Sequence, residues 1–124
     1  MKYLLCCLLT FCVFENAYAR KLEDQLNDVY NNGVKEVNDK IANPILADIQ
    51  TVDNGKGCYQ KAQESMQQKV DSITHKLDRC RVAGRGIRNV EIAKKCSRIE
   101  ISRFEDDAND VKSTAETCIQ SSKI

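Results

Sequence analysis

Four cysteines in the second half of the chain are the residues whose types and spacing carry the most chemistry. Cys58, Cys80, Cys96 and Cys118 follow one another at intervals of 22, 16 and 22 positions. Cysteines can bind metals, act as nucleophiles or form disulfides, and the redox compartment decides between these roles. The first question is therefore where the chain resides.

The N-terminal segment predicts secretion. Lys2 precedes an apolar stretch, residues 3–14, and Ala17-Tyr18-Ala19 offers the small residues that signal peptidase recognises. A membrane anchor is the alternative, but a spanning helix needs about 20 apolar residues, and Glu15 interrupts this stretch too early. We therefore expect residues 1–19 to be a signal peptide and the mature protein to be secreted and extracellular.

Removal of residues 1–19 would leave four of the seven cysteines, an even number in an oxidising environment. Two disulfides are then expected, which leaves no thiolate for catalysis. Residues 20–124 are enough for one domain and too few for two. A composition of 42% hydrophobic and 30% charged residues is in the ordinary globular range.

The elements that must position the cysteines are helices. Apolar residues recur at steps of three and four along most of the mature chain, the spacing of one helix face, and we find no convincing strand pattern. These positions are Leu22, Leu26, Val29, Val34, Val37, Ile41, Ile45 and Ile49; Tyr59, Ala62, Met66, Val70, Ile73, Leu77 and Cys80; and Ile101, Phe104, Ala108, Val111, Ala115 and Cys118. The fold class predicted is all-α, a small helical bundle with N-terminal helices in residues 20–52 and a cysteine hairpin in residues 58–118.

Three sites are candidates for interruptions of these helices. Asn32-Gly33 is expected to kink or break the first helix, and Asn43-Pro44 to end it, with Pro44 opening a new turn. Residues 53–57, rich in glycine, are expected to form a loop before the cysteine hairpin.

The helical spacing narrows the disulfide pairing. Twenty-two positions return a helix to within about 40° of its starting direction, but separate the two residues by about 33 Å, so neither such pair can bond within one helix. An antiparallel hairpin brings Cys80 opposite Cys96 and Cys58 opposite Cys118. The alternative, Cys58 with Cys96 and Cys80 with Cys118, needs parallel helices and an extended crossover. The short connection favours the nested pairing.

Charge is unevenly distributed along a chain whose net charge is only +1. Residues 76–103 contain nine basic and three acidic residues, whereas residues 20–75 and 104–124 are both net acidic. In the hairpin, this block forms the turn and the flanking helix ends, with Gly84-Arg85-Gly86 at the tip. The candidate anion-binding residues are Arg81, Arg85, Arg88, Lys94 and Lys95.

A cationic turn held by a disulfide is suited to sulfated glycans, anionic lipid headgroups or an acidic protein surface, because guanidinium groups make forked hydrogen bonds to oxyanions. The alternative is that these residues solvate the turn and pair with Glu91, Glu100 and the acidic run 105–107. Nucleic acid is not an expected partner, since no aromatic residues accompany the basic block.

No other residues form a catalytic or metal-binding pattern. His75 is the single histidine, and the acidic residues 105–110 lack the spacing and glycine of a calcium loop. We therefore expect a protein that is not an enzyme and has no cofactor and no metal.

The spacing Cys58-x21-Cys80-x15-Cys96-x21-Cys118, with its amphipathic segments and signal peptide, resembles the TsetseEP-type family of secreted insect proteins. The resemblance covers residues 20–124. It implies an extracellular, gut- or immunity-associated protein without a catalytic role, and only the cysteines match, as structural residues.

The sequence is compatible with three functions. The first is extracellular binding through the basic tip, the one we favour. The others are a venom, salivary or immune-related effector with membrane activity, and a carrier of small apolar ligands; near-neutral charge and few aromatic residues respectively disfavour them. The helical periodicity fits a monomer or a dimer.

Overall fold

The structure is a computed structural model that describes the backbone of residues 2–53 and 57–122 and the side chains of residues 17–53 and 57–121. Its elements are α1 (Lys2–Glu36), the π-helical turn η1 (Val37–Ala42), α2 (Asn43–Val52), α3 (Cys58–Gly86) and α4 (Val90–Ser122). The described residues contain helices and no strand, which confirms the predicted all-α class.

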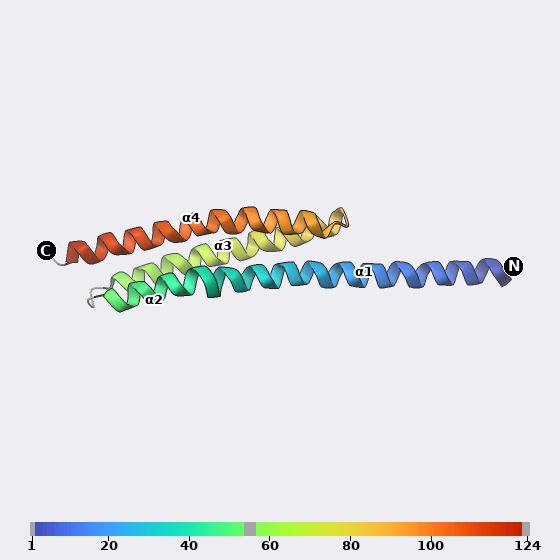
Figure 1. Ribbon diagram of the computed structural model, residues 1–124, viewed down its shortest axis with the longest axis horizontal. Helices are drawn as coiled ribbons and strands as arrows, with labels where there is room; N and C mark the ends of the chain where they lie inside the picture. The colour runs from blue at the N-terminus through green and yellow to red at the C-terminus, as the bar shows by residue number, and fades with distance from the viewer. Residues whose placement is uncertain (1, 54–56, 123–124) are drawn as a thin grey trace.

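The helices form an elongated bundle of three columns (Figure 1). α1, η1 and α2 make one continuous column, and α3 and α4 form an antiparallel hairpin that lies alongside it. α1 extends past the α3–α4 turn at its N-terminal end. Leu22 is the first buried residue of α1 among those whose side chains are described, and Tyr18, one turn earlier, lines a groove with residues of the α3–α4 turn.

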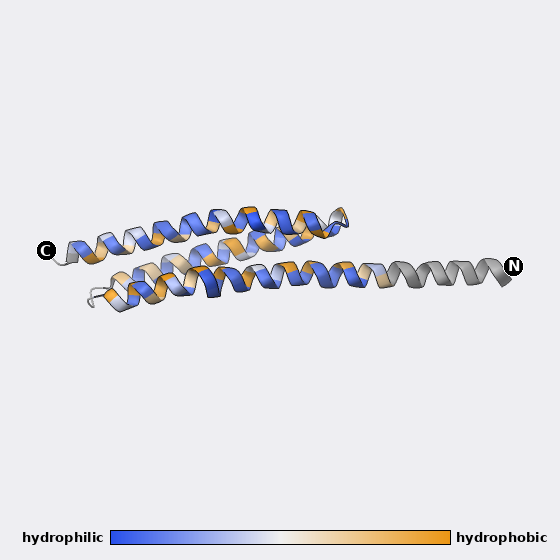
Figure 2. Ribbon diagram, in the orientation of Figure 1, coloured by the Kyte–Doolittle hydropathy of each residue, from blue (hydrophilic) through white to orange (hydrophobic). Residues whose placement is uncertain are grey.

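The core follows the apolar positions that the sequence predicts. Each helix has apolar residues interspersed with polar ones, as expected of amphipathic helices (Figure 2). The larger buried cluster lies along the three columns, and its largest fully buried side chains include Met66 and Leu77. A smaller cluster of Leu22, Leu26 and Ala93 closes the bundle near the α3–α4 turn.

The expected interruption at Asn32-Gly33 is wrong, because α1 continues through both residues. Gly33 is buried, and a Cβ at this position would lie 3.3 Å from Cδ1 of Leu77. Here glycine serves close packing of α1 against α3 rather than a turn. The cost of glycine within a helix, about 1 kcal/mol, is offset by that tertiary contact.

Pro44 lies at the start of a new helix, α2, as predicted, but the prediction that Asn43-Pro44 ends the preceding helical segment is wrong. It lies in the first turn of α2. The π-helical turn η1 precedes it and connects α1 directly to α2. The chain therefore remains helical across the proline.

The predicted loop falls between α2 and α3, with residues 54–56 outside the described part of the chain. Asp53 ends α2, and its Oδ2 accepts a hydrogen bond of 3.3 Å from the backbone N–H of Tyr59 in the first turn of α3. This contact satisfies one of the unpaired N–H groups at the start of α3.

The apolar stretch 3–14, on which the signal-peptide prediction depends, lies outside the residues whose side chains are described. Among the residues that the structure describes, no helix has the length and apolar character required to cross a bilayer.

Candidate functional site

Two disulfides hold the hairpin that presents the basic block. Cys58 is bonded to Cys118 with their Cα atoms 5.8 Å apart, and Cys80 to Cys96 with their Cα atoms 5.5 Å apart. This is the nested pairing of the two that the sequence left open. The second bond lies near the α3–α4 turn, so it fixes the two helix ends from which the basic residues project.

Gly84 is a packing residue of this end and not part of an exposed tip. A Cβ at Gly84 would lie 2.8 Å from the Cβ of Ala93 in α4 and 2.8 Å from Cδ2 of Leu26 in α1. Contacts this short are incompatible with the present backbone positions. Glycine therefore allows the three columns to converge beside the turn.

The turn itself consists of residues 87–89, and we call these the hairpin tip. The backbone N–H of Asn89 donates to the carbonyl of Gly84 at 2.9 Å, and that of Arg88 to the carbonyl of Arg85 at 3.2 Å. This pair of bonds is the Schellman arrangement, which ends a helix with a left-handed residue at the position that Arg88 occupies. Arg88 has a φ of 53°.

Arginine is an unfavourable residue for that position. Glycine is the usual occupant, because a Cβ in the left-handed region costs about 1 kcal/mol. The next residue, Asn89, caps α4, with its Oδ1 accepting a 3.0 Å hydrogen bond from the N–H of Glu91. The turn is thus well formed and holds the Arg88 side chain in an exposed position.

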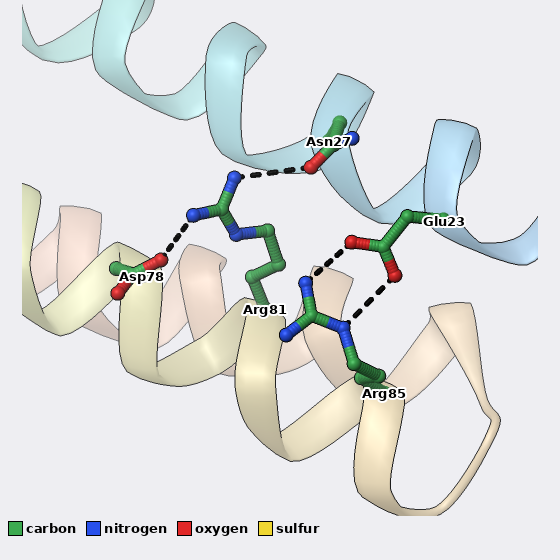
Figure 3. A network of polar contacts seen from close by, with 5 residues as sticks. All are labelled: Glu23, Asn27, Asp78, Arg81 and Arg85. Atoms are coloured by element: carbon green, nitrogen blue, oxygen red, sulfur yellow. Dashed lines mark hydrogen bonds and ion pairs between the residues drawn. The ribbon is translucent and has the colours of Figure 1, made fainter.

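Arg85 points away from the tip toward α1 (Figure 3). Its Nε donates to Oε2 of Glu23 at 2.9 Å, and a terminal guanidinium nitrogen contacts the other carboxylate oxygen. The hydrogen bond from Arg85 holds the pKa of Glu23 below its usual value. This forked pair joins α3 to the first part of α1 that contacts the hairpin.

Arg81, one helical turn earlier, also contacts α1 (Figure 3). One terminal nitrogen donates to Oδ1 of Asn27 at 3.0 Å, and the other pairs with Asp78 in α3. The guanidinium carbon lies 4.4 Å from the ring centroid of Tyr30, a cation–π contact. Arg81 and Arg85 therefore connect helices, whereas the sequence analysis placed both in an anion-binding group.

The other three predicted residues are exposed around the tip. Lys94 pairs with Glu91 at 3.3 Å across one turn of α4, with 51% of its side chain exposed. Arg88 and Lys95 are exposed and take part in no ion pair among the residues with described side chains. The structure thus divides the five candidates into two arginines that join α3 to α1, Arg81 and Arg85, and three cations with no ion pair to another helix among the described residues, Arg88, Lys94 and Lys95.

The expected pairing with acidic residues on α4 is present in part. Glu91 pairs with Lys94, and Glu100 with Arg103 at 3.4 Å. Within the described region, no ion pair involves the acidic run 105–107.

The residues of α1 that contact the two helix-joining arginines were not predicted from the sequence. Glu23 and Asn27 are four positions apart, as are their partners Arg85 and Arg81, so two matching rows meet across antiparallel helices. Lys21 was missed as well. It lines a shallow groove of about 360 Å³ together with Arg88 and Asn89.

His75 is exposed on α3. In the part of the chain that the structure describes, no three histidine, cysteine, aspartate or glutamate residues are grouped as a metal ion requires.

The site is thus a rigid helical end with an arginine held at an unfavourable backbone position and further cations around it. Comparison of the chain with protein-family models, with curated proteins and with solved structures gave no match.

Proposed function

We propose that the protein is a secreted, non-enzymatic binding protein whose hairpin tip holds sulfated glycans. The observation that carries the proposal is Arg88, an exposed arginine with a φ of 53° at a position where glycine would stabilise the turn. Unfavourable backbone conformations of this kind are concentrated at functional sites. A binding role of the exposed guanidinium group would explain why this position has arginine and not glycine.

The neighbourhood of Arg88 suits a polymeric anion better than a single small one. Lys21 lies across the shallow groove from the tip, and the exposed Lys94 and Lys95 follow on the first turns of α4. Cations spread over an exposed surface attract an extended chain of sulfates, whose charges interact with several of them simultaneously. Arginine adds forked hydrogen bonds to individual sulfate groups.

The disulfides and the contacts of α1 are also compatible with secretion of the protein. Two disulfides are compatible with an extracellular protein. Cleavage before Arg20 would remove Tyr18, which lines the groove beside the tip, but would leave Leu22, Glu23 and Asn27 in place, so the hydrogen bonds from Arg85 and Arg81 to α1 would persist. It would also create an α-ammonium group on Arg20, next to Lys21, which increases the positive charge near the tip.

The test is retention of the oxidised mature protein on immobilised heparin, compared with Arg88→Gly. We expect the variant to elute at lower salt, because one cation is lost from the tip. Its free energy of unfolding should rise by about 0.5–1 kcal/mol, since glycine tolerates the left-handed conformation. Binding and stability thus change in opposite directions.

The control is Lys35→Ala, which removes one exposed charge from α1 outside the tip and should elute with the wild type. Equal retention of wild type and Arg88→Gly, or passage of the wild type through the column at low salt, would contradict the proposal.

A further inference from the structure

A second surface lies between α3 and α4, and no described side chain of α1 or α2 lines it. It is a groove of about 190 Å³ beside the Cys58–Cys118 disulfide, and its lining includes the buried residues Ala62, Val111 and Ala115. Each of these three residues is at most 6% exposed. The groove is smaller than the roughly 300–1,000 Å³ of typical small-molecule pockets. Its size therefore favours a protein surface over a small molecule as the occupant.

The two sides of the groove have opposite charge. Lys61 and Lys69 line it from α3, and Asp107 and Asp110 line it from α4. Among the described side chains, none of these four charges belongs to an ion pair within 4.0 Å. Opposite charges thus face the same groove and are available to a partner.

The disulfide sets the level of these residues along the groove. Lys69 is 11 positions after Cys58, and Asp107 is 11 positions before Cys118. Because α3 and α4 are antiparallel, Lys69 and Asp107 lie at the same height on opposite sides.

This arrangement is complementary to itself. A two-fold axis that runs along the groove places α3 of one copy over α4 of the other, with Lys69 of each facing Asp107 of its partner. An axis across the groove would instead place α3 over α3 and bring like charges together. Charge therefore selects the first arrangement.

We propose that the groove is the interface of a parallel homodimer of this chain. The groove spans about 17 Å of α3, from Cys58 to Lys69, so the contact is small and the dimer weak, in the micromolar range or above. In a parallel dimer both hairpin tips point in the same direction. This inference is independent of the proposed function, although two tips on one dimer would bind a polymeric anion more tightly than one wherever the polymer spans both.

The test is sedimentation equilibrium of the oxidised protein over roughly 1 µM to 1 mM, with Lys69→Glu and Asp107→Lys as variants. We expect wild type to associate, and each variant alone to associate at least about tenfold more weakly, because two attractive contacts per dimer become repulsive. Lys35→Glu, an exposed charge reversal on α1, is the control and should associate like wild type.

A mixture of the two variants gives the decisive result. In the mixed dimer, the substituted position 69 of the Lys69→Glu copy faces the substituted position 107 of the Asp107→Lys copy, so that contact is again between opposite charges. The other contact joins the native Lys69 and Asp107 side chains. We therefore expect the mixture to recover wild-type association, which a pairing within one chain cannot produce. A monomeric wild type, variants that associate like wild type, or a mixture no stronger than its components would overturn the proposal; thermal unfolding confirms that each variant is folded.

Discussion

Gly84 and Gly86 are two positions apart in α3 and have opposite surroundings. A Cβ at Gly84 would meet Ala93 and Leu26 at 2.8 Å, whereas a Cβ at Gly86 would meet no atom within 4 Å. Ala93 has no flexible side chain that could move aside. The close approach of the three columns near the tip therefore depends on the first glycine and not on the second.

Gly84→Ala is expected to lower the free energy of unfolding by about 1–3 kcal/mol, despite the higher helix propensity of alanine. Gly86→Ala, the matched control, should leave it unchanged or raise it by up to about 1 kcal/mol. Chemical denaturation of both variants measures the difference. A Gly84→Ala protein as stable as Gly86→Ala would show that the columns do not approach this closely.

Arg88 and Arg85 show how little residue type alone reveals about role. They are three positions apart, and the sequence analysis grouped them together. Arg85 donates a hydrogen bond to Glu23, whereas Arg88 is the left-handed residue of the turn and has an exposed side chain. The distinction depends on a contact across 62 positions and on a backbone angle, neither of which composition or local charge determines.

At the scale of the elements, the Glu23–Arg85 pair links α1 to the hairpin. The pKa of Glu23 is lowered from its ordinary value of 4.5 by the hydrogen bond from Arg85. A carboxyl group with a lowered folded-state pKa contributes stability above its unfolded pKa and loses it as the pH falls through the folded value. The pair is exposed, so its contribution is modest.

Glu23→Gln should accordingly be less stable than wild type at neutral pH, and the difference should vanish as the pH falls well below 4.5. Thermal unfolding across that pH range measures it. Asp24→Gln is the control, because Asp24 is an exposed acidic neighbour without an ion pair among the described residues. A difference between Glu23→Gln and wild type that does not depend on pH would rule out the ion pair as its cause.

The elements themselves were largely predictable from the sequence. Steps of three and four place Met66 and Leu77 of α3 and Phe104 of α4 in the core, where the structure has them. The nested disulfides follow from helix geometry once the hairpin is antiparallel. These features depend on local periodicity, which the sequence displays directly.

The features that sequence analysis got wrong or missed depend on contacts between columns. Asn32-Gly33 has the composition of a turn, but Leu77 of α3 packs against Gly33 and the helix continues. Likewise, Glu23 and Asn27 show their role only when α3 is placed beside them. The sequence shows that Glu23 and Asn27 are four positions apart, but it does not show that Arg85 and Arg81 are their partners.

At the scale of the whole molecule, the excess of basic over acidic residues lies near the tip end of the hairpin. Residues 76–103 hold nine basic residues, and the segments before and after them are net acidic. Ion pairs to α1 and within the helices use part of this charge for structure. Some cations of this end therefore hold the bundle together, and others are available to a ligand.

The most direct measurement compares two variants that each remove two positive charges near the tip. Arg81→Gln/Arg85→Gln removes the helix-joining pair, and Arg88→Gln/Lys95→Gln removes the exposed pair. We predict that the second variant elutes from immobilised heparin at clearly lower salt with an unchanged unfolding temperature, whereas the first keeps its retention and unfolds at a lower temperature. Equal losses of retention would contradict the account, because binding would then follow total charge and not the division between the two pairs.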